Sequence, residues 1–180
     1  MACQPPHPNA MVLSPRSARF AISQKLTNMS RFEREKGAYK ISTDPRCIDL
    51  EATHDYLSHS YWAKGISKET LANAIADSLC FALLDGNRQV GFARVVTDRT
   101  TFAYLCDVYV LEEFRGKGLG KWLVAEVLSH PNLQGLRRFV LVTRDAHGLY
   151  AQLGFGPLEN PASFMEIVRP YILPVVAPGT

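Results

Sequence analysis

The sequence has no long apolar run, no closely spaced pair of cysteines and no extended run of basic residues. Its apolar runs are too short to cross a bilayer, so we expect no membrane partner. The four cysteines, Cys3, Cys47, Cys80 and Cys106, lie far apart without a CxxC pair. This spacing argues against a zinc site and a disulfide framework, and it favours a reducing compartment. We therefore predict a cytoplasmic protein that holds no metal.

Acidic residues are missing from the first part of the chain, where no Asp or Glu occurs before Glu33. Such a segment, with scattered Arg, Lys, Ser and Pro, is typical of a disordered tail, which we favour. An organelle presequence has the same composition, and translation from Met29 would make the segment a start-site extension. We predict a tail at residues 1–36, one folded domain at 37–170 and a C-terminal tail at 171–180.

What is present is an ordinary globular composition with a small positive charge. Of the 180 residues, 47% are apolar and 21% are charged, which is enough for one domain with a core. The net charge of +3 fits an anionic small ligand. Because no basic stripe accompanies it, the charge does not indicate a nucleic-acid partner.

The hydrophobic periodicity changes along the chain and predicts both strands and helices. In chain order we expect a strand at 39–42, helices over 47–62 and from Ser67, strands at 80–84, 90–96 and 102–111, a helix after Gly120 that Pro131 ends, a strand at 138–143, a short helix at 146–153 capped by Gly154, and a last strand at 164–168. Hairpins come first and strand–helix–strand units come after them. This order predicts an α+β sandwich, with a single mixed, mostly antiparallel sheet of about six to seven strands and helices on both faces.

The most informative stretch is Arg115-Gly116-Lys117-Gly118-Leu119-Gly120, between an apolar strand and an amphipathic helix. Three alternating glycines leave the backbone bare, so successive N–H groups can point at one anion. The next helix adds the positive end of its dipole. The stretch therefore predicts a site for a phosphate-bearing ligand.

Two familiar phosphate loops do not fit this spacing. A Walker A loop needs GxxxxGK and then Ser or Thr, whereas Gly116 to Lys121 is one residue short and Trp122 replaces the hydroxyl. A dinucleotide fingerprint needs GxGxxG, and the spacing of Gly116, Gly118 and Gly120 is again one residue short.

The loop matches the [R/Q]xxGx[G/A] signature of the GNAT superfamily of acyl-CoA-dependent N-acyltransferases. The preceding Asp107-Val108-Tyr109-Val110 resembles that family's fourth strand, and Leu149-Tyr150-x-x-Leu153-Gly154-Phe155 resembles the helix and turn after its fifth. The order of elements from about Tyr39 to Val168 also agrees. The chain therefore resembles a GNAT acyltransferase over most of its length.

The resemblance implies where acetyl-CoA, the acyl donor, would bind. The loop amides of Arg115, Gly116, Lys117, Gly118, Leu119 and Gly120 would hold the pyrophosphate of coenzyme A. The backbone groups of Val108 and Val110 would pair with the pantetheine arm, and Tyr109 between them also counts among the cofactor-binding residues. The arm would lie in a gap where two parallel strands splay, beside a bulge in the earlier strand. The N–H of Val110 is the candidate oxyanion donor.

Two residues are candidates for proton transfer. Tyr150 matches the family's frequent general acid, which would protonate the leaving thiolate; the alternative is a tyrosine that only packs under the cofactor. Asp107 is an acid in an otherwise apolar strand, so it is either the base for the attacking amine or a structural hydrogen-bond acceptor. Many members carry Asn near the end of the fifth strand, and here Thr143-Arg144-Asp145 stands instead.

The resemblance implies transfer of acetyl from acetyl-CoA to a primary amine, attacking directly in a ternary complex. The acceptor would be a small molecule or a peptide, and the protein either a monomer or a homodimer. Tyr61 and Trp62 could form an aromatic wall of the acceptor pocket, or simply pack against the sheet. A non-catalytic acyl-CoA-binding module and transfer of a longer acyl chain are the alternatives.

Overall fold

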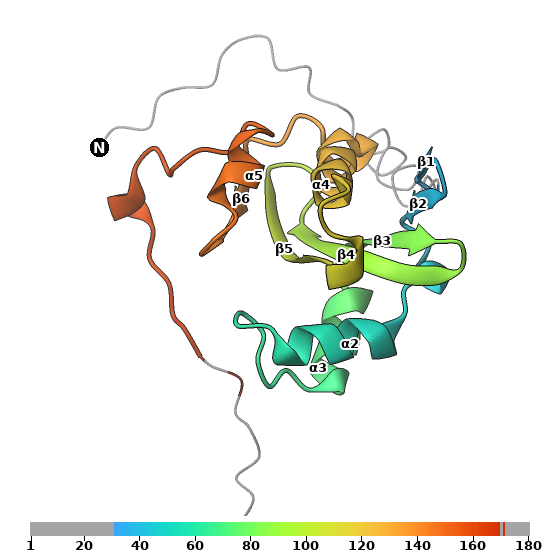
Figure 1. Cartoon of the computed structure of the whole chain (residues 1–180). Coiled ribbons are helices and arrows are strands. Elements are labelled where there is room, and N and C mark those ends of the chain that lie inside the picture. The colour runs from blue at the N-terminus through green and yellow to red at the C-terminus, as the bar shows by residue number, and fades with distance from the viewer. Residues whose placement is uncertain (1–30, 170, 172–180) are drawn as a thin grey trace, which may run out of the picture. The chain divides into compact units, whose positions relative to one another are not determined.

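The computed structural model describes residues 31–169 and Tyr171, and its central element is one six-stranded sheet (Figure 1). The strands are β1 (Glu33–Lys36), β2 (Tyr39–Ser42), β3 (Leu79–Asp85), β4 (Arg88–Thr97), β5 (Phe102–Val110) and β6 (Arg138–Leu141). Their order in the sheet is their order in the chain. All neighbours from β1 to β5 are antiparallel, and β5 and β6 are parallel. The predicted mixed, mostly antiparallel sheet is confirmed.

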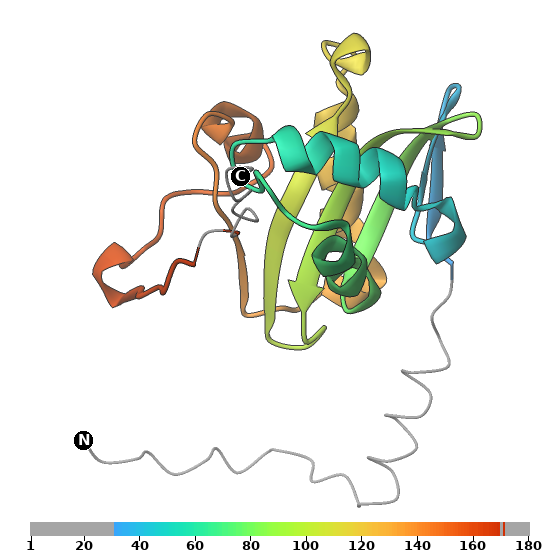
Figure 2. The ribbon, with the colours of Figure 1, turned by 90° about the horizontal axis from the view of Figure 1, so that it is seen from below.

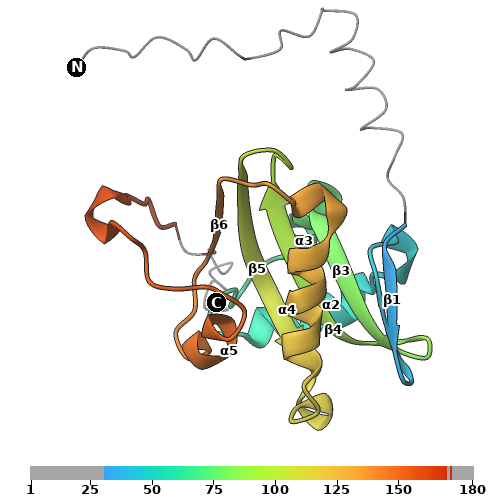
Figure 3. The ribbon, with the colours of Figure 1, turned by 90° about the horizontal axis from the view of Figure 1, so that it is seen from above.

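Helices cover both faces of this sheet, as predicted. The α-helices are α2 (Leu50–His59), α3 (Lys68–Ala76), α4 (Leu119–Ser129) and α5 (His147–Ala151), with short 3-10 turns η1 (Pro45–Cys47), η2 (Glu112–Phe114), η3 (Pro131–Leu133) and η4 (Pro161–Ser163). Figure 2 shows α2 and α3 in front of one face, and Figure 3 shows α4 in front of the other. The two faces therefore carry separate cores.

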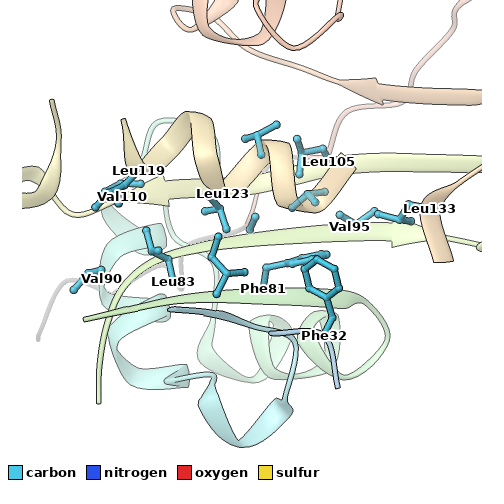
Figure 4. Close-up of a cluster of buried hydrophobic side chains, with 14 of the residues drawn as sticks. Phe32, Phe81, Leu83, Val90, Val95, Leu105, Val110, Leu119, Leu123 and Leu133 are labelled. Carbon is cyan, nitrogen blue, oxygen red and sulfur yellow. The ribbon is translucent and has the colours of Figure 1, made fainter. Parts of the chain in front are cut away.

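The core under α4 contains the apolar side of the amphipathic helix that the sequence predicts. Leu119, Leu123 and Val127 recur along one side of the helix and are buried. They pack against buried strand residues, among them Phe81, Leu83, Val90, Val95 and Leu105 (Figure 4). This packing fixes the start of α4, and with it the glycine loop, relative to the strands.

The core on the opposite face joins α2 and α3 to the sheet. Leu57 and Leu71 are fully buried there, together with Phe92 and Tyr109 from the central strands. Ser67 caps α3 as predicted, because its side chain accepts a hydrogen bond from the backbone N–H of Thr70.

Two sequence expectations about strands are wrong. The strand β1 lies before the predicted first strand, and it pairs with β2 although its residues are all charged. Such an edge strand has no apolar alternation to reveal it. The strand expected at 164–168 is absent, since these described residues are exposed and form no ladder. A segment rich in apolar residues that favour strands forms a strand only where it pairs with a neighbouring strand.

The predicted tails fall almost entirely outside the described residues. Of the tail predicted at 1–36, residues 1–30 lie outside the described residues, whereas Glu33–Lys36 form β1. Of the tail predicted at 171–180, only Tyr171 is described. Within the described part of the chain, no helix is both long and apolar enough to cross a membrane.

Candidate active site

The parallel strands β5 and β6 stay together for only part of their length. Their pairing runs from Phe102 opposite Arg138 to Leu105 opposite Leu141, while β5 continues to Val110. Figure 3 shows the two strands diverging toward the end of the sheet where α4 begins. The second half of β5 therefore has β4 on one side and a gap on the other. This is the splay that the resemblance implies.

A bulge in β5 accompanies the splay, also as expected. Two residues of β5, Asp107 and Val108, stand opposite the single residue Ala93 of β4, so the register shifts there. Asp107 has φ of 53°, a left-handed conformation that is uncommon for a residue with a side chain. A bulge with this conformation bends its strand and redirects the residues after it.

The backbone of Val110 faces the gap. The N–H of Leu111 donates to the carbonyl of Val90 at 2.9 Å, and Val110 lies opposite Gly91. This pattern makes Val110 and Gly91 a non-hydrogen-bonded pair, so the N–H and C=O of Val110 both point away from β4. The C=O accepts a hydrogen bond from Nε of Arg115 at 3.2 Å. Arg115 thus occupies the C=O, while the N–H of Val110 is directed into the gap.

The glycine loop connects this strand to α4. Gly116 and Gly118 have φ of 75° and 73°, and no atom lies within 4 Å of where a Cβ would be at either residue. Gly118 is the N-cap of α4, and no side chain supplies a capping hydrogen bond. The first N–H groups of the helix have no acceptor inside the helix either. An open, left-handed backbone at an uncapped helix start suits a phosphate group.

The cations of the loop have partners within the protein. Nζ of Lys117 lies 3.4 Å from the hydroxyl of Tyr39 and 4.8 Å from the centre of the Phe114 ring. The guanidinium of Arg115 turns the other way, toward β5 and α2. Leu119, the next residue into the helix, is buried and anchors the loop.

Tyr150 lies on α5, half-buried against the core under α4. The edge of its ring meets Phe155, and Gly154 between them turns with φ of 92°. Burial raises the pKa of the Tyr150 phenol above its usual value of 10, and the nearby Tyr61 and Asp145 raise it further. The hydroxyl is therefore protonated at neutral pH and able to donate.

Asp107 is buried and has a partner. Its carboxylate accepts from Nε of Arg94, on the neighbouring strand β4, at 2.6 Å, and the same guanidinium donates to Oγ of Ser78 at 3.1 Å. Burial lowers the pKa of Arg94, but Asp107 together with the nearby Cys106 and Cys80 raises it by more, so the net shift is upward. This geometry supports the interpretation of Asp107 as a structural hydrogen-bond acceptor, while its role as a base stays a prediction.

The aromatic residues expected on the acceptor side connect two loops. Tyr61 is 46% exposed and Trp62 39% exposed, and their rings meet edge to face. The Arg144 guanidinium stacks over the Tyr61 ring, 3.7 Å from its centre, and the Arg144 backbone N–H donates to the Tyr61 hydroxyl. The link after α2 therefore meets the link after β6, the strand that borders the gap.

Sequence reasoning missed three residues of this region: Arg94, Tyr56 and Gln89. Arg94 left a signal, because it is a lone charge in an apolar strand, as Asp107 is in the next strand. Tyr56 and Gln89 left no signal, since their hydrogen-bond partners, Arg115 and Thr53, are distant in sequence.

A model of the acetyltransferase (GNAT) family matches residues 48–155. The chain belongs to this family. The crystal structure of a GNAT-family protein from Xanthomonas campestris is 49% identical, with a TM-score of 0.73, and the match covers 76% of this chain and 96% of that one.

Two curated relatives agree with this assignment. A Gibberella zeae protein classed as an acetyltransferase is 34% identical over 140 residues, covering 65% of this chain and 78% of that protein. The peptidyl-lysine N-acetyltransferase YjaB of Salmonella typhimurium is 30% identical over 150 residues, covering 82% and 95%. Family membership supports acyltransferase activity. Among residues 31–169 and Tyr171, no group of three or more His, Cys, Asp or Glu side chains is placed to hold a metal ion.

We predict that Gly118→Val weakens the binding of coenzyme A at least tenfold. The left-handed backbone strains a β-branched residue, and the added side chain fills the open side of the helix start. Titration calorimetry with coenzyme A measures the effect. Gly37→Val is the matched control, because Gly37 has φ of 60° in the turn between β1 and β2. Equal affinities of the two variants for coenzyme A would show that the loop does not bind it.

Proposed function

We propose that the protein transfers the acetyl group of acetyl-CoA to a primary amine by direct attack within a ternary complex. The observation that carries this proposal is the Val110 N–H, directed into the gap between β5 and β6. A hydrogen-bond donor in such a gap suits a thioester carbonyl, whose oxygen gains negative charge during attack.

The donor would extend from the glycine loop into the gap. Its pyrophosphate would accept hydrogen bonds from the amides of residues 115–120, at the positive end of α4. Its pantetheine arm would lie against the half of β5 that β6 leaves unpaired, beside Val108 and Val110. In this pose the thioester comes beside the bulge at Asp107.

The reaction would proceed in two steps. The amine nitrogen attacks the thioester carbon and forms the C–N bond, while the carbonyl electron pair moves to the oxygen and the Val110 N–H stabilises it. The intermediate then collapses, the C–S bond breaks, and the electron pair leaves on the sulfur. The Tyr150 hydroxyl donates its proton to that sulfur, giving the free thiol of coenzyme A, and is reprotonated by solvent.

The attacking amine must lose a proton, because a free alkylamine has a pKa of about 10.4. Asp107 is the proposed acceptor of this proton, directly or through a water. The hydrogen bond from Nε of Arg94, at 2.6 Å, holds this carboxylate in one position.

The acceptor would be a small molecule or a peptide carrying a primary amine. A relative that acetylates peptidyl lysine supports an alkylamine acceptor. The exposed rings of Tyr61 and Trp62, beside the gap, would line its path. Aromatic faces attract an ammonium group before it is deprotonated.

Thiol release from acetyl-CoA, in the presence of lysine peptides, free amino acids, aminoglycosides and simple alkylamines, tests the function. We expect at least one class to accelerate release, with an equimolar N-acetylated product in the mass spectrum. Tight binding of acetyl-CoA without release across all classes would instead indicate a binding module. Release with octanoyl-CoA but not acetyl-CoA would assign a longer acyl chain.

Tyr150→Phe tests the general acid. An acid must be protonated to act, and the pKa of Tyr150 is raised, so kcat should fall only above about pH 10 in the unaltered protein. The variant should lose this alkaline limb and about 10²-fold in kcat. Tyr104→Phe, at another half-buried tyrosine with a raised pKa, is the control. A higher KM for acetyl-CoA with unchanged kcat would leave Tyr150 a packing role only.

Asp107→Asn and Arg94→Gln separate the two roles of Asp107. Either change breaks the buried ion pair, so both should lower the melting temperature. A base is lost only in Asp107→Asn, which should lower kcat by about 10²-fold, while Arg94→Gln keeps the carboxylate and most of kcat. If kcat falls equally in both variants, the ion pair is structural and the base lies elsewhere.

A further inference from the structure

The guanidinium of Arg115 joins three elements. Arg115 begins the glycine loop, its Nε donates to the carbonyl of Val110 in β5 at 3.2 Å, and its Nη2 donates to the hydroxyl of Tyr56 in α2 at 3.0 Å. Tyr56 lies 59 residues away in the chain. The side chain therefore reaches from the donor side of the protein to the helix on the acceptor side.

Tyr56 is itself held in place. Its ring stacks on Tyr109 with the two centres 4.0 Å apart and the planes only 13° from parallel. The hydroxyl of Tyr109 accepts from Gln89 at 2.9 Å, and Gln89 also donates to Thr53 on α2 and accepts from the backbone N–H of Asp49. The hydroxyl that Arg115 contacts is thus a fixed point rather than a freely rotating group.

The position of Arg115 addresses a problem that the splay creates at Val110. Without β6, both the C=O and the N–H of this residue face the gap with no strand opposite them. A carbonyl left there would present its lone pairs beside the thioester oxygen and would need another partner. The Nε–H of Arg115 supplies that partner, and only the N–H of Val110 stays available to the acyl group.

We propose that Arg115 is a positioning residue, which orients the Val110 peptide as an oxyanion donor and couples that orientation to α2 through Tyr56. This inference rests on the proposed function, because it assigns a role within the same site. It differs from a role as a cation for the pyrophosphate, since two N–H groups of the planar guanidinium are directed at neutral oxygens of the protein. A lysine cannot reproduce this fork.

Infrared spectroscopy of acetyl-CoA labelled with ¹³C at the thioester carbonyl tests the proposal without an acceptor. A hydrogen bond from Val110 lowers the stretching frequency of that carbonyl when it binds. We expect Arg115→Lys to lose at least half of this shift while calorimetry shows an affinity for acetyl-CoA within about threefold of the original. Arg88→Lys is the matched control, because Arg88 is an exposed arginine near the loop that pairs with Glu113.

Tyr56→Phe tests the coupling to α2, since it removes the hydroxyl and keeps the stacked ring. It should lose part of the same shift, and the double variant with Arg115→Lys should be no worse than Arg115→Lys alone, because both act through one contact. The Arg115→Gln variant repeats the test if Arg115→Lys fails to fold.

The outcomes distinguish this inference from the function on which it rests. If the unaltered protein does not bind acetyl-CoA, the proposed function fails. If it binds with a shifted band that Arg115→Lys leaves in place, the positioning role is wrong. A large loss of affinity with an unchanged band assigns Arg115 to the phosphates instead.

Discussion

Strand pairing that stops halfway along β5 is the constraint on which this structure depends. After Leu105 the strand has a neighbour on one side only, and the bulge at Asp107 shifts its register against β4 before pairing resumes at Tyr109. Backbone groups on such an edge need partners. Elsewhere an edge of this kind invites another strand, whereas here it borders the gap in which the proposed function would seat the acyl donor.

The two cores hold the borders of this gap still. Under α4, buried leucines and valines fix the helix start, so the glycine loop is a defined cradle although its own backbone is left-handed and open. On the other face of the sheet, the stacked rings of Tyr56 and Tyr109 fix α2 against β5. Ligand contacts can then depend on backbone groups, because rigid packing positions them.

The bulge is stabilised by charge as well as by packing. Asp107 adopts an uncommon backbone conformation, and its carboxylate is bound by Arg94 from the neighbouring strand at 2.6 Å. Removing either partner would leave a buried charge unpaired, so the pair holds the strained residue in one arrangement. The same carboxylate lies next to the reacting centre of the proposed mechanism. A structural role and a proposed chemical role therefore fall on one residue.

The sequence by itself determined the glycine loop and the elements that carry it. Glycine spacing indicated an anion site at a helix start, the apolar stripe of α4 was readable, and motif order identified the family. Periodicity missed the all-charged β1 and suggested a strand at 164–168, where the structure forms none. Only the tertiary structure decided which partners the polar groups take. Arg115 and Tyr56 are 59 residues apart, and their contact depends on how a helix docks on the strands, which no local window of sequence contains.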